Sequence, residues 1–256
     1  MATGTIKVDM AMNHVAVLTL DRPPVNAIDR ATREAFVEEM DRLGAREDVR
    51  AIVLTGNGKV FCAGADIKEK RDLAEKDGDF ARANRLTRDT FLALIECPKP
   101  VIAAVNGAAI GAGFVMAACS DIIVAAESAT FAMPEIDVGQ GGGGSFLQRI
   151  LPSGKVRRLT LTGERIAAAE LYRLGAIEEC VPADALLPKA LEIAALIAEK
   201  SPAAVRAIRG GFHVVEHLGL YEGFRLEQEY TTKLSRTSDA AEARRAFLEK
   251  RKPRFE

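Results

Sequence analysis

The sequence predicts an α/β fold, because patterns typical of strands alternate with patterns typical of helices along its first half. The apolar runs Val101–Val105 and Ile122–Ala126 are expected to be buried strands, and Gly111–Cys119 between them has a helical pattern. This alternation favours a sheet whose strands are at least partly parallel. After Gly144 the strand patterns stop, so the C-terminal third is predicted to be mostly helical.

The N-terminal segment is predicted to contain two strands, a helix and a third strand. Ile6–Asp9 and His14–Leu20 are expected strands, the second ending before the turn residues 21–24. Asp29 is placed to cap a helix over Ala31–Leu43, in which apolar residues recur at helical spacing. Ala51–Thr55 is a compact strand rich in β-branched residues, closed by a glycine-containing turn.

A charged stretch, Lys68–Asp79, is expected to be an exposed helix or loop, and Phe80–Cys97 a helix that Pro98 and Pro100 end. Beyond Gly144 the helical candidates share spaced apolar and alanine residues. They are Phe146–Leu151, Gly154–Leu161, Ala167–Leu174, Ala185–Lys200, Pro202–Leu218 and Leu220–Leu234.

The composition is that of an ordinary globular protein. The chain has 256 residues, of which 48% are hydrophobic and 28% charged, and its net charge is −1, so no overall field attracts nucleic acid or an anionic membrane. Cysteines 62, 97, 119 and 180 have no regular spacing. With no recognisable leader and no apolar run of roughly 18–20 residues, we expect a soluble cytoplasmic protein with reduced thiols.

Two turns of small residues carry the strongest functional information. They are Phe61–Lys68 and Asn106–Gly113, and each follows an apolar run. Small side chains let a ligand approach the backbone, and the second turn opens into a helix, where free N–H groups and the positive dipole end meet. Two such donors aimed at one oxygen form an oxyanion hole, so the turns predict an enzyme that acts on a carbonyl compound.

A candidate acid–base group is Glu135, which stands among apolar and small residues. Such surroundings disfavour the charged form of a carboxylate and suit a general base or acid. If the segment is extended, Asp137 lies on the same face. The alternatives are a surface carboxylate at Glu135 and a helix cap at one of the two acids.

Several ordered motifs resemble the crotonase (enoyl-CoA hydratase/isomerase) superfamily over nearly the whole chain. They are residues 64–68, 106–113, Cys119-Ser120-Asp121, Pro134-Glu135 and 249–252. The resemblance implies a spiral of ββα units and an acyl-CoA thioester substrate. It also implies a catalytic core over residues 1–200 and a helical C-terminal region, 201–256, that assembles a homotrimer or a dimer of trimers.

The resemblance also assigns roles in the site. The N–H groups of Ala65 and Ala112 would form the oxyanion hole, with Ala112 in place of the usual glycine. Lys68 and Lys250 fall where the family meets CoA, Lys250 only loosely and from a neighbouring subunit. The remaining expected substrate contacts are Ala63, Asp66, Ile67, Gly111, Val115, Pro134 and Gly143. No metal or organic cofactor is required, because CoA is part of the substrate.

Position 115 departs from the family pattern. Hydratases of the family carry a first glutamate there, whereas this chain has Val115, and only Glu135 matches the second. A single carboxylate suffices for double-bond isomerisation, and single-glutamate hydration or lyase chemistry has precedent in the family. The alternative is a catalytically weak acyl-CoA-binding protein. An RNA-binding relative would be expected to show a basic enrichment that is absent here.

Two other motifs match known binding patterns but are expected to be structural. Gly139–Gly144 matches G-x-G-x-x-G, but no second strand follows, so a flexible wall of the acyl pocket is favoured over a nucleotide site. His213–His217 matches the H-x-x-E-H zinc pattern, yet no third ligand is evident, and a solvated helix face is expected. His14 is expected to be structural.

Overall fold

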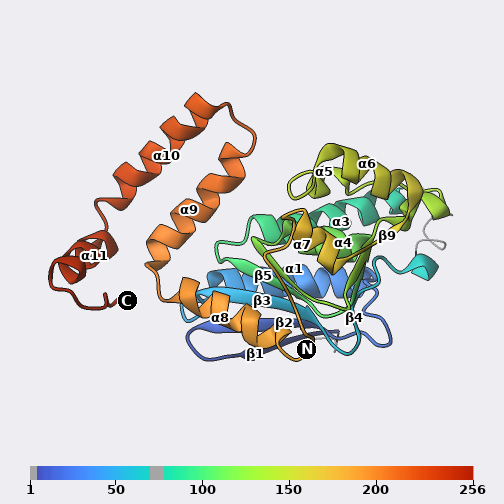
Figure 1. Cartoon of the computed structure of the whole chain (residues 1–256), viewed down its shortest axis with the longest axis horizontal. Helices are drawn as coiled ribbons and strands as arrows, with labels where there is room; N and C mark the ends of the chain where they lie inside the picture. Colours follow the sequence, from blue (N-terminus) through green and yellow to red (C-terminus); the bar gives the residue numbers. More distant parts are fainter. Residues whose placement is uncertain (1–4, 70–77, 256) are drawn as a thin grey trace.

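The computed structural model describes residues 5–69 and 78–255, and its strands form two sheets (Figure 1). The larger sheet has the strand order β1-β2-β3-β5-β7-β10. Only the β1–β2 pair in it is antiparallel, among the residues described. Its strands are β1 Ile6–Met10, β2 Val15–Leu20, β3 Ala51–Gly56, β5 Val101–Val105, β7 Ile122–Ala126 and β10 Glu179–Val181.

The smaller sheet has the order β4-β6-β8-β9 and consists of strands of three residues. They are β4 Val60–Cys62, β6 Ala108–Ile110, β8 Thr130–Ala132 and β9 Arg165–Ala167. Successive segments repeat one pattern: a strand of the large sheet, a strand of the small sheet, then a helix. This repeat gives β3–β4–α3, β5–β6–α4 and, with the 3-10 helix η1 before α5, β7–β8–α5, so the predicted α/β spiral of ββα units is confirmed. The helices and η1 are α3 Asp79–Ile95, α4 Ala112–Cys119, η1 Pro134–Val138 and α5 Gly144–Leu147.

The core surrounds β5, whose five residues are all buried, as expected for a parallel strand covered on both faces. Helix α4, Ala112–Cys119, is buried along its whole length and is apolar on every side. Helix α1, Arg30–Ala45, begins as predicted, because Asp29 Oδ1 accepts a hydrogen bond from Thr32 N at 2.8 Å. Helix α3 spans Asp79–Ile95.

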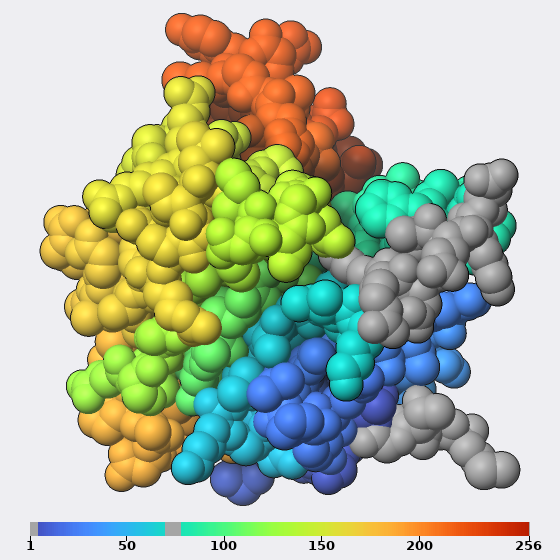
Figure 2. Space-filling model, turned by 90° about the vertical axis from the view of Figure 1, so that its right-hand side faces the viewer, coloured from blue at the N-terminus to red at the C-terminus, as the bar shows by residue number. Residues whose placement is uncertain are grey.

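The region after residue 144 is mostly helical, as predicted, with the two short strands β9 and β10 as unexpected additions. Its helices are α5 Gly144–Leu147, α6 Ser153–Thr162, α7 Ala168–Arg173, α8 Leu186–Ala198, α9 Pro202–Val215, α10 Leu220–Leu234 and α11 Ser238–Leu248. Helix α8 packs on β3, β5 and β7. Helices α9, α10 and α11 extend away from the two sheets (Figure 1), and the orange part of this region rises above the rest of the molecule in Figure 2.

The segment Pro134–Val138 is a 3-10 helix, η1. An extended chain was the condition for placing Asp137 on the same face as Glu135, and that condition is not met. Of the charged stretch Lys68–Asp79, residues 70–77 lie outside the described part of the chain. Within the described part, no helix combines the length and the apolar character needed to cross a membrane.

Candidate active site

The two small-residue turns lie side by side because the strands that precede them are paired. Strands β4 and β6 are parallel, with Cys62 opposite Ala109, so their carboxyl ends reach the same edge of the small sheet. Gly64 has a φ of +91°, and a Cβ on it would lie 2.8 Å from the carbonyl oxygen of Ile110 and 3.6 Å from the nitrogen of Ala112. Glycine therefore allows the close approach of the two turns.

Two backbone N–H groups at this junction have no acceptor among residues 5–69 and 78–255. On either side of Ala65, Ala63 N donates to Val25 O at 3.0 Å and Asp66 N to Ile28 O at 3.1 Å. Ala112 is the first residue of α4, where an N–H has no partner within the helix. Among described residues, no acceptor takes a hydrogen bond from the N–H of Ala65 or of Ala112. The predicted oxyanion donors are therefore neighbours and are available.

Glu135 lies next to the second turn. It follows Pro134 in η1, and its carboxylate approaches Gly111, the residue before α4. The φ of Gly111 is +54°, and a Cβ there would lie 2.4 Å from Oε1 of Glu135. The carboxylate thus stands beside the helix N-terminus that supplies the Ala112 N–H group.

Two cavities meet at Ala65, Glu135 and Gln140. The outer cavity has a volume of about 460 Å³ and lies between the turn after β4 and η1, segments that adjoin on the face seen in Figure 2. Four predicted contact residues line it: Ala63, Ile67, Gly111 and Pro134. Because Glu135 borders both cavities, a ligand that filled them would pass directly by its carboxylate.

The inner cavity has a volume of about 360 Å³ and a mostly apolar wall. The predicted residues Ala112, Val115 and Gly143 line it, together with Gly139, Gly141 and Gly142. A Cβ on Gly143 would lie 2.6 Å from Cγ2 of Val115. The glycine run thus forms a wall of this cavity, and it follows the 3-10 helix η1, where a dinucleotide fingerprint would need a strand.

The inner cavity has one carboxylate among the described residues that line it, and that is Glu135. Val115, at the position of the first glutamate in the family pattern, is 2% exposed and lies in the wall of this cavity. Asp137 lines only the outer cavity. The structure therefore offers neither Asp137 nor another described lining residue as a replacement acid inside this cavity.

Asp66 and Lys68 lie outside the described linings of both cavities. Asp66 instead holds the first turn in place: Oδ2 pairs with Arg22 Nη2 at 2.9 Å, and Oδ1 accepts from Lys68 N at 3.0 Å. Burial acts against it, but these hydrogen bonds lower the pKa of Asp66 below its usual value. Lys250 lies just beyond α11 and is exposed.

Helix α3 contributes to the inner cavity, which the sequence did not indicate. Phe80, Asn84, Thr87 and Phe91 line it. Their spacing of three to four residues marks one helix face, but periodicity alone does not say which cavity that face meets. Cys62, in the first turn, is fully buried, and burial raises the pKa of its thiol to about 12, which disfavours the thiolate that a nucleophile needs.

The H-x-x-E-H segment shows no metal geometry. Glu216 is paired with Arg149 at 3.0 Å, and His217 is exposed beyond the end of α9. His213 is mostly buried, with Nε2 at 3.9 Å from Oδ1 of Asp121. Across residues 5–69 and 78–255, no three potential ligand side chains converge. His14 Nδ1 lies 3.1 Å from Asp48 O, in a turn before β2.

Known proteins with similar sequences and folds identify the family of this chain. The family model described as enoyl-CoA hydratase/isomerase matches residues 10–256. The chain belongs to the enoyl-CoA hydratase/isomerase family. A crystal structure of enoyl-CoA hydratase from Bacillus anthracis superposes with a TM-score of 0.92 and 34% identity, covering 98% of both chains.

Three curated relatives of this family member are enzymes with different names. A (7aS)-7a-methyl-1,5-dioxo-2,3,5,6,7,7a-hexahydro-1H-indene-carboxyl-CoA hydrolase of Mycobacterium tuberculosis is 37% identical, over 92% of this chain and 95% of its own. A 2,3-dehydroadipyl-CoA hydratase of Escherichia coli is 37% identical, over 94% of each chain. A carnitinyl-CoA dehydratase of Proteus mirabilis is 35% identical, over 94% of each chain. This family member is accordingly an enzyme that acts on CoA thioesters.

Proposed function

We propose that this enzyme transfers protons on an acyl-CoA thioester, with Glu135 as its acid–base group and the N–H groups of Ala65 and Ala112 as its oxyanion hole. The position of Glu135 carries the proposal: it borders both cavities and touches the turn that supplies one of the two donors. In this arrangement the CoA arm occupies the outer cavity and the acyl group the inner one.

Removal of a proton from the α-carbon places negative charge on the thioester oxygen. The two N–H groups stabilise that enolate, each by about 3–4 kcal/mol in comparable sites. Glu135 takes the α-proton, the double bond shifts, and the same carboxylate returns the proton to the γ-carbon. This sequence is a double-bond isomerisation, and it needs one carboxylate and neither a metal nor an organic cofactor.

Single-glutamate hydration or lyase chemistry is the second form of the proposal. The names of the relatives include a hydratase and a dehydratase, which favours addition or removal of water. Without an acid at Val115, Glu135 alone would have to activate the water and supply the proton. Both forms share the enolate and the same two donors.

The test compares Glu135→Gln with the unmodified enzyme on a panel of 2-enoyl-, 3-enoyl- and 3-hydroxyacyl-CoA thioesters. We expect turnover to fall by about 10²-fold or more with acyl-CoA affinity nearly unchanged, because amide and acid have the same shape. Full activity of the variant would overturn the role of Glu135. The products separate the two forms: a shifted double bond indicates isomerisation, and a 3-hydroxyacyl-CoA indicates hydration.

A catalytically weak acyl-CoA-binding protein is the alternative that the apolar wall at Val115 favours. Such a protein would bind acyl-CoA without turning over any member of the panel. In deuterium oxide it would also leave the α-carbon unlabelled. Uptake of deuterium at that carbon by the unmodified chain, lost in Glu135→Gln, excludes the alternative.

The region 201–256 is proposed to assemble a homotrimer or a dimer of trimers in the cytoplasm. Large apolar side chains on its helices support this, since Phe212, Phe224 and Phe247 are 57%, 58% and 82% exposed. Lys68, and Lys250 from a neighbouring subunit, would then contact CoA. Sedimentation analysis tests the assembly, and a monomer at micromolar concentration would contradict it.

A further inference from the structure

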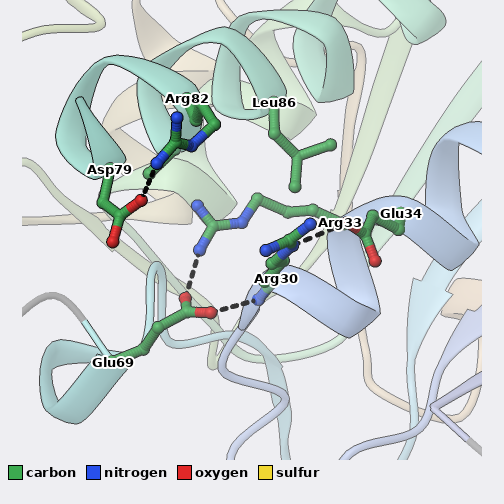
Figure 3. Close-up of a pocket in the computed structure, with 8 residues that line it drawn as sticks. Arg30, Arg33, Glu34, Glu69, Asp79, Arg82 and Leu86 are labelled. Carbon is green, nitrogen blue, oxygen red and sulfur yellow. Dashed lines mark hydrogen bonds and ion pairs between the residues drawn. The ribbon is translucent and has the colours of Figure 1, made fainter. Parts of the chain in front are cut away.

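Arg33, in the first turn of α1, carries a charge that is buried almost completely. Its side chain is 2% exposed, and its guanidinium has three partners, of which Figure 3 shows Glu69. Nη2 binds Glu69 Oε2 at 2.6 Å, Nη1 donates to Thr87 Oγ1 at 3.0 Å, and Nε donates to Asp29 O at 3.3 Å. A buried guanidinium is costly unless it is paired and hydrogen-bonded, and these contacts, one from each of its three nitrogens, fix its position.

Glu69 joins this arginine to the first oxyanion turn. It lies four residues after Ala65, and residues 67–69 are helical. The short helical connection therefore limits how far Ala65 and Glu69 can move relative to each other. Its other oxygen, Oε1, accepts from Arg30 N at 2.8 Å at the start of α1, where a carboxylate also meets the positive end of the helix dipole. Glu69 therefore ties the segment that follows Ala65 to the first turn of α1.

Backbone hydrogen bonds also connect the first turn to the residues just before α1. Ile28 forms a parallel bridge with Ala65: Ile28 N donates to Gly64 O at 2.8 Å, and Ile28 O accepts from Asp66 N. Since Ile28 precedes α1 by two residues, Ala65 is held to the beginning of α1 from both of its flanks. The direction of the Ala65 N–H group thus depends on where α1 stands.

Thr87 extends the connection to the inner cavity. It lies on α3, and its side chain faces Arg33 while the residue also lines the inner cavity. One guanidinium therefore contacts both the carboxylate that anchors the oxyanion turn and a helix that forms a wall of the inner cavity. Arg33 thus connects the segment that carries the Ala65 N–H group to helix α3 in the cavity wall.

The hollow around these residues is unsuited to an anionic ligand. It has a volume of about 180 Å³, and its three arginines are Arg30, Arg33 and Arg82. Each is already paired with a carboxylate: Glu34, Glu69 and Asp79, respectively (Figure 3). With no uncompensated positive charge among these side chains, the cluster organises the structure and does not capture a phosphate.

We propose that Arg33 and Glu69 are positioning residues that aim the Ala65 N–H group at the thioester oxygen and hold α3 at a fixed distance from it. The inference rests on the proposed function, since it assigns a cause to the geometry of that oxyanion hole. An oxyanion donor must be placed within a few tenths of an ångström to act, so loosening its anchor weakens transition-state stabilisation more than substrate binding.

The test uses Glu69→Ala and Glu69→Gln, with Glu170→Ala as the matched control. Glu170 forms a two-contact ion pair with Arg173, at 2.7 and 2.9 Å, on α7 and away from the described linings of both cavities. Each protein binds a saturated acyl-CoA labelled with ¹³C at the thioester carbonyl, and the infrared stretch of that carbonyl reports its polarisation. Turnover is measured on a thioester that the unmodified enzyme converts.

We expect kcat to fall about tenfold or more in Glu69→Ala, less in Glu69→Gln, with KM changed less than about threefold. The carbonyl shift should shrink in the same order and stay intact in Glu170→Ala. Arg33→Lys keeps the positive charge but loses the planar guanidinium that contacts three partners at once. Its effect should resemble that of Glu69→Gln. Melting temperatures of all variants separate a loss of folding from a loss of positioning.

Two results would overturn the inference in different ways. If the unmodified enzyme polarises the carbonyl and Glu69→Ala does so equally, with an unchanged kcat, the hole does not depend on Glu69. If the unmodified enzyme itself leaves the carbonyl stretch at its value in water, the proposed oxyanion hole is wrong, and the positioning role falls with it.

Discussion

Gly111 and Glu135 are in such close contact that the Cβ which glycine lacks would lie 2.4 Å from Oε1 of the carboxylate. The contact brings the proposed proton carrier to the N-terminus of α4, next to the Ala112 N–H group. Two properties of glycine are needed at once: its small size and its freedom to adopt a φ of +54°. Position 111 therefore links the proposed acid–base group to the proposed oxyanion hole.

Gly111→Ala should displace Glu135 and lower kcat by about tenfold or more. It should also destabilise the fold by about 1–2 kcal/mol, because alanine is strained at a positive φ. Gly58→Ala is the matched control, since Gly58 has a φ of +77° and nothing within 4 Å of its Cβ position. Gly58→Ala therefore has the strained backbone of an alanine at positive φ but no clash with a neighbouring side chain. Equal kcat values for the two variants would show that the contact with Glu135 is irrelevant to turnover.

Ala112→Pro should remove one oxyanion donor with little harm to the fold. Ala112 is the first residue of α4, where proline is well tolerated because that N–H has no helical acceptor. We expect kcat to fall by about 10²–10³-fold, the cost of losing one such donor. Ala112→Gly keeps the N–H group and should remain close to the unmodified enzyme. Comparable activity of the proline variant, with a normal melting curve, would contradict the role of this donor.

The order of strands and helices could be predicted from the sequence because the long elements carry their own pattern. The all-apolar run Val101–Val105 indicated a buried parallel strand, and Asp29 marked the start of α1 correctly. Strands of three residues, such as Val60–Cys62, are too short to show alternation and depend on their neighbours in the small sheet. Periodicity could not find them.

Within the site, residues close in sequence were easier to predict than those brought together by folding. The Ala65 and Ala112 turns follow paired strands and lie together as the motif resemblance implied. The backbone at Pro134 stayed open between an extended segment and a helix, because proline at the first position suits both, and the structure shows a 3-10 helix there. The contacts of Arg33 with Glu69 and Thr87 span 36 and 54 residues, a distance over which local pattern carries no information.

His213 should make the folded protein sensitive to mildly acidic pH. Burial first, then Arg209 and Arg149, lower its pKa from the usual 6.5, while Asp121 and Glu216 act in the opposite direction. The unfolded chain therefore binds a proton at a higher pH than the folded one does. This contribution to stability is complete above about pH 6.5 and declines as the pH falls below that value.

Urea unfolding at pH 8 and pH 5.5 measures this effect. His213→Asn should lose less stability between the two pH values than the unmodified protein does. His217→Asn, which changes an exposed histidine four residues away, should behave like the unmodified protein. If both variants show the same loss as the unmodified chain, another group governs the acid sensitivity.

Val115→Glu should increase hydration at the expense of stability. Val115 is 2% exposed in the wall of the inner cavity, so a carboxylate there loses its hydration and should lower the free energy of unfolding by about 1–3 kcal/mol. It would also supply a second acid–base group beside Glu135, the arrangement that water addition favours. We expect the rate of 3-hydroxyacyl-CoA formation from a 2-enoyl-CoA to rise about tenfold. Val115→Gln has nearly the same size and a similar stability cost but no acid, so equal hydration by the two variants would show that the missing carboxylate does not limit this reaction.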